Sequence, residues 1–258
     1  MRNKPYKLLL FILIAFSLSC SSDDDNTNSE NGINHAPNLK STGSSARDFL
    51  SASNHESLVI EILYVGNFQP QAQTLVNLKQ FMESRLNKPG GITISQRQID
   101  SPGNAPYDIN EISEIEKANR TKYNDFNVLT LYILFIDGNY STDTSTALTL
   151  GVSYRNTSCV IFEKSVHLLS DSINEPNRAD LETIVILHET GHLLGLVDLG
   201  SPMQQEHLDE AHGKHCDNKN CLMYWETENK IMNQPVTPGN IPGLDANCLA
   251  DLKANGGK

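Results

Sequence analysis

Apolar residues recur along the chain with the two periods that distinguish strands from helices. Short apolar runs bounded by turn-forming residues are typical of β-strands, and they occur at Leu58 to Val65, Ile92 to Ile99, Val128 to Ile136, Ala147 to Tyr154 and Ser158 to Phe162. Segments with helical spacing lie at Gln71 to Leu86, Asp108 to Asn124 and Asp245 to Lys253. This order of elements predicts an α/β (α+β) fold.

A further helix is predicted just after the last of these strands. Asn177 is suited to cap its start, Asp180 favours the positive end of the helix dipole, and apolar residues from Leu181 onward supply buried surface. Gly195 is expected to end the helix, because glycine readily adopts the left-handed conformation found at helix C-termini.

The sequence HETGHLLGLVD, from His188 to Asp198, carries the candidate chemistry of the chain. His188 and His192 are four residues apart, so on a helix their side chains lie on one face and can share one metal ion. Glu189 then lies beside that metal without binding it. The turn at Gly195 would bring Asp198 back toward the same metal.

This segment resembles the motif of the metzincin metallopeptidases, His-Glu-x-x-His-x-x-Gly-x-x-His or Asp followed by a turn that contains methionine. The resemblance implies a zinc ion held by His188, His192 and Asp198, with the aspartate as in the snapalysin branch, and Glu189 as the general base. The methionine would be Met223, for which plain core packing is the alternative. Competing third ligands follow in a short polar stretch, at His207, His212 and His215, with Glu206 and Glu210 among them.

The metzincin resemblance also implies a fold and a mode of substrate binding. It predicts a twisted mixed sheet with a backing helix and an active-site helix, and a small C-terminal subdomain across the cleft. The segment Leu148 to Tyr154 would be an exposed sheet edge that pairs with extended substrate, although an ordinary half-buried strand explains it equally well.

Five cysteines fit an exported protein. If Cys20 carries a lipid, an even set remains, and two disulfides are the simplest reading, Cys216 with Cys221 and Cys159 with Cys248. The run from His215 to Met223 also resembles part of the archaemetzincin pattern, His-Cys-x4-Cys-x-Met, whose cysteines help to bind a second zinc. The later Cys-x-x-Cys pair of that pattern is missing here, so a Cys/His zinc cluster stays as the alternative to the disulfides.

The N-terminal part of the chain indicates where the protein works. Residues 1–20 have a basic start and an apolar run too short to span a membrane, and they read as a signal peptide that ends at Cys20. This end resembles a bacterial lipobox, and the following Ser-Ser-Asp-Asp-Asp resembles the export tag of Bacteroidota-type surface lipoproteins. We therefore expect an outer-membrane lipoprotein exposed at the cell surface and anchored to the membrane through Cys20, with ordinary secretion and a plain acidic linker as alternatives.

The rest of the chain divides into a tether and one domain. Residues 21–55 are polar and are expected to form a flexible tether, and residues 56–258 are expected to form the catalytic domain. The chain has 31 acidic against 20 Lys and Arg residues, which argues against nucleic-acid binding. We expect a monomeric zinc metalloendopeptidase that acts on peptides or proteins. The alternatives are a non-catalytic surface binding protein with this fold and a zinc hydrolase of a non-peptide amide.

Overall fold

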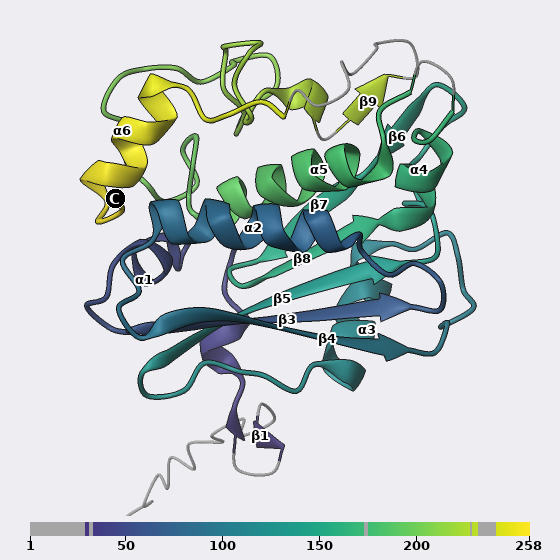
Figure 1. The fold of residues 1–258 in the computed structure, drawn as a ribbon, viewed down its shortest axis with the longest axis horizontal. Coiled ribbons are helices and arrows are strands. Elements are labelled where there is room, and N and C mark those ends of the chain that lie inside the picture. The colour runs from purple at the N-terminus through teal and green to yellow at the C-terminus, as the bar shows by residue number, and fades with distance from the viewer. Residues whose placement is uncertain (1–28, 31–32, 173–174, 228, 232–240) are drawn as a thin grey trace, which may run out of the picture.

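The computed structural model describes residues 29–30, 33–172, 175–227, 229–231 and 241–258 (Figure 1). The strands are β1 (Ser29–Glu30), β2 (Ile33–Asn34), β3 (Ser57–Val65), β4 (Gly91–Ile99), β5 (Val128–Ile136), β6 (Ala147–Thr149), β7 (Gly151–Arg155), β8 (Ser158–Phe162) and β9 (Asn229–Ile231). The α-helices are α1 (Ala46–Leu50), α2 (Ala72–Arg85), α3 (Ile109–Asn119), α4 (Glu163–Leu168), α5 (Arg178–Leu193) and α6 (Ala246–Ala254). Two short 3₁₀ helices are η1 (Ala36–Asn38) and η2 (Trp225–Thr227).

The central sheet has five strands in the order β4-β3-β5-β8-β7. The first four strands are parallel, and β7 runs antiparallel to β8 at one edge. In the middle of the sheet Ile60 pairs with Ile94 on one side and with Leu131 on the other. The central strand β5 is buried on both faces, which explains its continuous apolar sequence.

Helices cover both faces of this sheet (Figure 1). Leu78 of α2 and Val185 of α5 belong to the larger buried cluster, together with Ile60 and Leu131 from one face of the sheet. On the other face, Ile112 of α3 packs in a second cluster with Tyr132 and other sheet residues. The predicted α/β (α+β) fold is confirmed. Helix α5 packs on one face of the sheet, next to the edge strand β7.

Most of the predicted elements are confirmed, two of them with the same bounds, β5 and β8. The strand expected at Ala147 to Tyr154 is instead divided into β6 and β7 by a break at Leu150. The helix expected to reach Asn124 begins after the predicted cap Asp108, in a capping box with Glu111, and ends at Asn119. It ends early because Arg120 is extended and turns its guanidinium inward, onto Glu116, Thr130 and Thr157.

The last part of the expected tether is folded. Phe49 and Leu50 of α1 are fully buried in the larger core cluster. The ammonium group of Lys88 donates hydrogen bonds to three carbonyl oxygens of this region, those of Asp48 (2.6 Å), Ser51 (2.7 Å) and His55 (2.6 Å). From Asn34 to residue 55 the chain therefore belongs to the domain, in contrast to the tether expected there.

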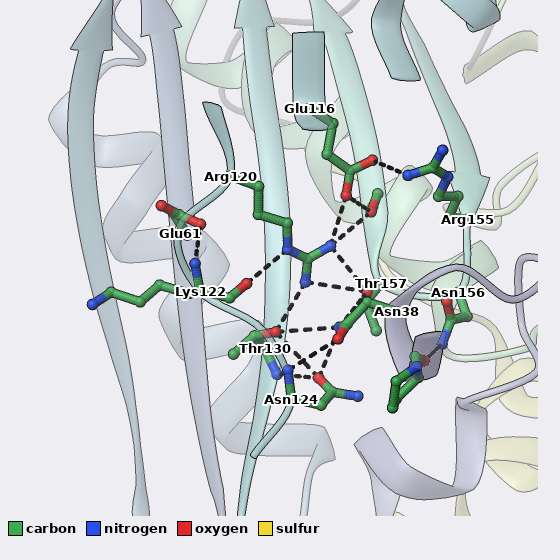
Figure 2. Close-up of polar contacts among 12 residues, drawn as sticks. Asn38, Glu61, Glu116, Arg120, Lys122, Asn124, Thr130, Arg155, Asn156 and Thr157 are labelled. Carbon is green, nitrogen blue, oxygen red and sulfur yellow. Dashed lines mark hydrogen bonds and ion pairs between the residues drawn. The ribbon is translucent and has the colours of Figure 1, made fainter. Parts of the chain in front are cut away.

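A buried polar network attaches this N-terminal segment to the sheet, as Figure 2 shows. The Asn38 side chain is fully buried and donates to Asn124 Oδ1 and Thr157 Oγ1, each at 2.9 Å. Arg120 lies in the same network, next to Thr157 and Thr130. A polar composition predicted disorder here, but these polar groups are buried with partners, which composition alone does not reveal.

No helix of the described part of the chain is long and apolar enough to cross a membrane. The predicted signal peptide, Cys20 and the acidic stretch after it lie outside the described residues.

Candidate metal centres

The active-site helix α5 has the predicted start and end. The Asn177 side chain accepts a hydrogen bond from the Asp180 backbone N–H at 2.9 Å, so it caps the first turn. Gly195 has φ +78°, and the Ser201 N–H bonds back to its carbonyl oxygen at 2.9 Å. A side chain at Gly195 would also come within 2.7 Å of the Ala46 Cβ, so both the turn and its packing require glycine.

Three buried histidines converge at the C-terminal part of this helix. His188, His192 and His215 each offer a ring nitrogen, and these nitrogens lie within 4.8 Å of one another. The Nε2 atoms of His188 and His192 are 3.1 Å apart. Because His188 Nδ1 contacts the Leu222 carbonyl oxygen at 2.7 Å and His215 Nδ1 contacts the His212 carbonyl oxygen at 2.8 Å, both rings are oriented by backbone acceptors. Such contacts fix the orientation of an imidazole ring, as is usual for histidines that bind a metal through the other ring nitrogen.

The third member of this group is His215, and the structure does not bring Asp198 to it. Asp198 is exposed, has φ +62° after Val197 at +52°, and is not among the residues whose ligand atoms gather at this point. His215 comes from a segment that returns to the helix later in the chain. Its place in the His-Cys-x4-Cys-x-Met run was the sequence signal that could have pointed to His215, although the motif spacing favoured Asp198.

The other candidate ligands lie elsewhere. His212 is exposed, stacks on the Trp225 ring with centroids 4.0 Å apart and contacts Asp209 at 2.9 Å. Glu206 and Glu210 are exposed as well. His207 is buried in a second cluster, described below.

Glu189 is buried next to the histidines. It lines a cavity of about 190 Å³ together with His192 and His215. Its backbone carbonyl accepts a hydrogen bond from Ser153 Oγ of β7 at 2.8 Å, which joins the helix to the sheet edge. The carboxylate therefore lies at the same cavity as the imidazoles, where a general base would have to be.

Met223 is fully buried beneath the helix, at the place where the resemblance predicted a methionine turn. A side chain methyl group at Gly191 would overlap the Met223 sulfur, so the absence of a side chain at Gly191 lets the thioether approach the backbone between the two helix histidines. Met223 therefore packs against the helix backbone between His188 and His192.

Burial lowers the pKa of His192 well below its usual value, and the neighbouring His188, His215 and Lys214 lower it further. The ring is therefore neutral at physiological pH. A neutral imidazole is the form that binds a metal ion.

The four cysteines of the described chain are free, in contrast to the two predicted disulfides. Cys159 is buried in the sheet, apart from the others, because β8 holds it in the core. Cys221 and Cys248 lie with their sulfurs 3.6 Å apart, and Cys216 belongs to the same place in the fold. Hydrogen bonds from the Cys216 and Cys248 thiols lower the pKa of Cys221 to about 3.

A histidine and an aspartate complete this cysteine cluster. Ligand atoms of His207, Cys216, Asp245 and Cys248 all lie within 4.8 Å of one another. Asp245 already caps α6, since its Oδ1 accepts the Cys248 N–H at 2.9 Å, and its Oδ2 accepts from Asn218 at 3.1 Å. His207 is 1% exposed, and its Nδ1 has no hydrogen-bond partner among the described residues.

The other ring nitrogen of His207, Nε2, is held in place by a carboxylate. His207 Nε2 contacts Asp251 Oδ2 at 2.8 Å, and the second oxygen of Asp251 accepts the Gln204 N–H at 2.7 Å. A carboxylate that orients a histidine in this way is common behind metal ligands. The sequence did not indicate Asp251, because 44 positions separate it from His207.

No protein-family model matches the chain, and no curated protein matches it. Among solved structures, the chain is similar to archaemetzincin from Methanopyrus kandleri, with 13% identity over 78% of this chain and 96% of that one and a TM-score of 0.49. It is also similar to metalloproteinase-II from Bacteroides fragilis, with 15% identity over 80% of this chain and 54% of that one and a TM-score of 0.42.

Proposed function

We propose that the protein is a zinc-dependent metallopeptidase. The observation that carries this proposal is the convergence of His188, His192 and His215 on one buried point beside Glu189. Three neutral imidazoles with one open position form a donor set that zinc prefers in hydrolytic sites. In place of the predicted Asp198, we assign His215 as the third ligand.

A zinc ion bound by these histidines would lower the pKa of a water molecule and polarise the scissile carbonyl group. Glu189 accepts the proton of the attacking water and transfers it to the departing amine. Its location on α5, directly after His188, keeps it at the cavity while the ring nitrogens are directed to the metal.

Cleavage of a mixed peptide library tests the proposal. The zinc-loaded chain is compared with its Glu189→Ala variant and with chain treated with a chelator, and products are identified by mass spectrometry. We expect cuts that disappear in both controls, with metal content unchanged in the variant. Equal cleavage by Glu189→Ala would overturn the role of Glu189, and no cleavage by zinc-loaded chain would favour a binding role or a non-peptide amide substrate.

We also propose that the cysteine cluster holds a second, structural metal ion. The ligands would be the thiolates of Cys216, Cys221 and Cys248 with His207 Nδ1, because the Asp245 oxygens are already committed to the cap of α6. The buried, unpartnered Nδ1 of His207 supports this choice. Measurement of zinc per chain by mass spectrometry should give two equivalents, and one equivalent in a triple Cys→Ser variant.

The sequence supports export as a lipoprotein anchored through Cys20. Metabolic labelling with a fatty acid should mark the wild-type chain and leave Cys20→Ser unlabelled. Surface exposure is tested by adding protease to intact cells.

A further inference from the structure

The chain segment beside the candidate active site has partners at both of its ends, in β6 and in the edge strand β7. The strand β6 pairs with β9, with Ala147 opposite Ile231 and Thr149 opposite Asn229. At the other end, the Ser153 carbonyl oxygen of β7 accepts a hydrogen bond from Thr42 Oγ1 at 3.0 Å. These two contacts restrict where an extended peptide can pair with this segment, which was expected from sequence to be an exposed edge from Leu148 to Tyr154.

Thr42 belongs to the segment of residues 37–42, here called the wall, which hydrogen bonds hold in place. The Asn156 side chain accepts the Lys40 N–H at 3.0 Å and donates to the Pro37 carbonyl oxygen at 2.8 Å, and its own N–H donates to the Lys40 carbonyl oxygen at 2.9 Å. Figure 2 shows Asn156 close to the network of Asn38, in which the same segment is anchored. Because these groups are buried and paired, displacing the segment would break several hydrogen bonds at once.

The wall closes one side of a small cavity. Thr42 and Leu199 line it together with Glu189 and His192, and its volume is about 190 Å³. Ligand pockets for drug-sized molecules measure roughly 300–1,000 Å³. The cavity beside the histidines has room for only a small part of a peptide.

The cavity also has a positive charge of its own. Lys214 lines it, directly before His215, and it is the only lysine or arginine among the described residues that do so. Its positive charge contributes to lowering the pKa of His192. Its ammonium group can donate a charge-assisted hydrogen bond to a negatively charged group, whereas Glu189 supplies the carboxylate of the same cavity.

We propose that Lys214 determines specificity by binding a carboxylate of a short peptide in this cavity. The inference rests on the proposed peptidase function and adds the substrate class. The carboxylate is that of a terminal residue or of an acidic side chain. Thr42 and β9 limit how far the peptide extends along the edge.

Two substrate comparisons test this proposal. The first uses four-residue peptides that differ only in a free or amidated C-terminus, or in Glu against Gln at each position. The second lengthens the preferred peptide at either end. Turnover gives kcat/KM for wild type, Lys214→Gln and Lys117→Gln, the last being an exposed lysine on α3 at the opposite face of the sheet. Dissociation constants of the same peptides are measured by fluorescence anisotropy on zinc-loaded Glu189→Gln.

We expect one carboxylate to improve kcat/KM and affinity by about 10- to 100-fold over its neutral partner, as for a charge-assisted hydrogen bond. Lys214→Gln should remove most of this preference, and Lys117→Gln should retain it. Equal binding of charged and neutral peptides, or an unchanged preference in Lys214→Gln, overturns the proposal. Because the affinities do not require turnover, this result is separate from a failure of the proposed peptidase function, in which zinc-loaded chain cleaves no peptide.

Discussion

The histidine cluster and the cysteine cluster are built in opposite ways. Two of the three histidines lie one turn apart on α5, a regular helix of 16 residues, so the helix itself sets their spacing. The ligands of the cysteine cluster come from irregular segments and from the start of α6. A helix can hold its ligands in place without a metal, whereas loops depend on the metal to fix their arrangement.

The two clusters should therefore respond differently to the loss of a ligand. Loss of a ligand in the histidine cluster should reduce activity and leave the fold nearly intact. Loss of a ligand in the cysteine cluster should destabilise the segment after Gly195 and α6 with it.

The largest effect is expected from His215→Ala. Removing a direct ligand should reduce kcat/KM by more than about 100-fold, since even the residues behind metal ligands cost 10–100-fold. Asp198→Ala is the matched control, because Asp198 is exposed outside the group and should leave activity within a few-fold of wild type. The reverse ranking in a peptide-cleavage assay would restore Asp198 as the third ligand.

Cys248→Ser should mainly affect stability. Loss of one thiolate from a structural site is expected to lower the free energy of unfolding by at least about 2 kcal/mol and to remove one zinc equivalent. Thermal unfolding with metal analysis measures both. Cys159→Ala is the control, since Cys159 lies outside the cluster and its replacement should leave two zinc equivalents. An unchanged zinc content in Cys248→Ser would contradict the assignment.

Gly191→Ala tests the packing of α5 against Met223. The added methyl group would overlap the Met223 sulfur, which costs about 1–3 kcal/mol for overpacking in a core. Denaturant unfolding measures the loss. Gly191→Ala combined with Met223→Ala should recover part of it, and a single variant as stable as wild type would show that Met223 does not pack there.

The smallest effect is expected at a buried acid pair, Glu163 and Glu182, that belongs to neither cluster. Burial and the neighbouring Glu182 raise the pKa of Glu163 well above its usual value of 4.5, although Arg178 opposes this. His167 lies 3.1 Å from the Glu163 carboxylate. Above about pH 4.5 the unfolded chain loses this proton while the folded chain keeps it, so stability falls as pH rises.

Glu163→Gln should remove this contribution. The variant should match wild type near pH 4 and unfold a few degrees higher at pH 8, with activity unchanged. Melting temperatures across pH 4–8 measure this. Parallel pH profiles for the two proteins would show that Glu163 is ionised in the folded state.

How far the sequence predicts this structure depends on the range of the interactions. The bounds of β5 and β8, the caps Asn177 and Asp108, and the end of α5 at Gly195 follow from local patterns. Each depends on residues within a few positions of one another, so a single sequence carries enough information.

The third histidine and the folded N-terminal segment depend on contacts that span much of the chain. His215 returns to α5 only after a long irregular segment, and the spacing from Gly195 to Asp198 does not reveal that Asp198 is exposed. In the same way, the Asn38 side chain donates a hydrogen bond to Thr157, which lies 119 positions later in the chain. A sequence pattern gives the residue types in such contacts but not the partners.

His215 and Cys216 are neighbours in the chain, so one peptide unit separates a ligand of each cluster. An ion taken up by the thiolates would restrict the movement of the whole segment and keep the third imidazole close to α5, which raises its effective concentration there. We therefore expect metal acquisition to be ordered, with the structural ion loading first and catalytic competence following. A chain that holds only the first ion would then be folded, and it would complete the histidine site when the second ion binds.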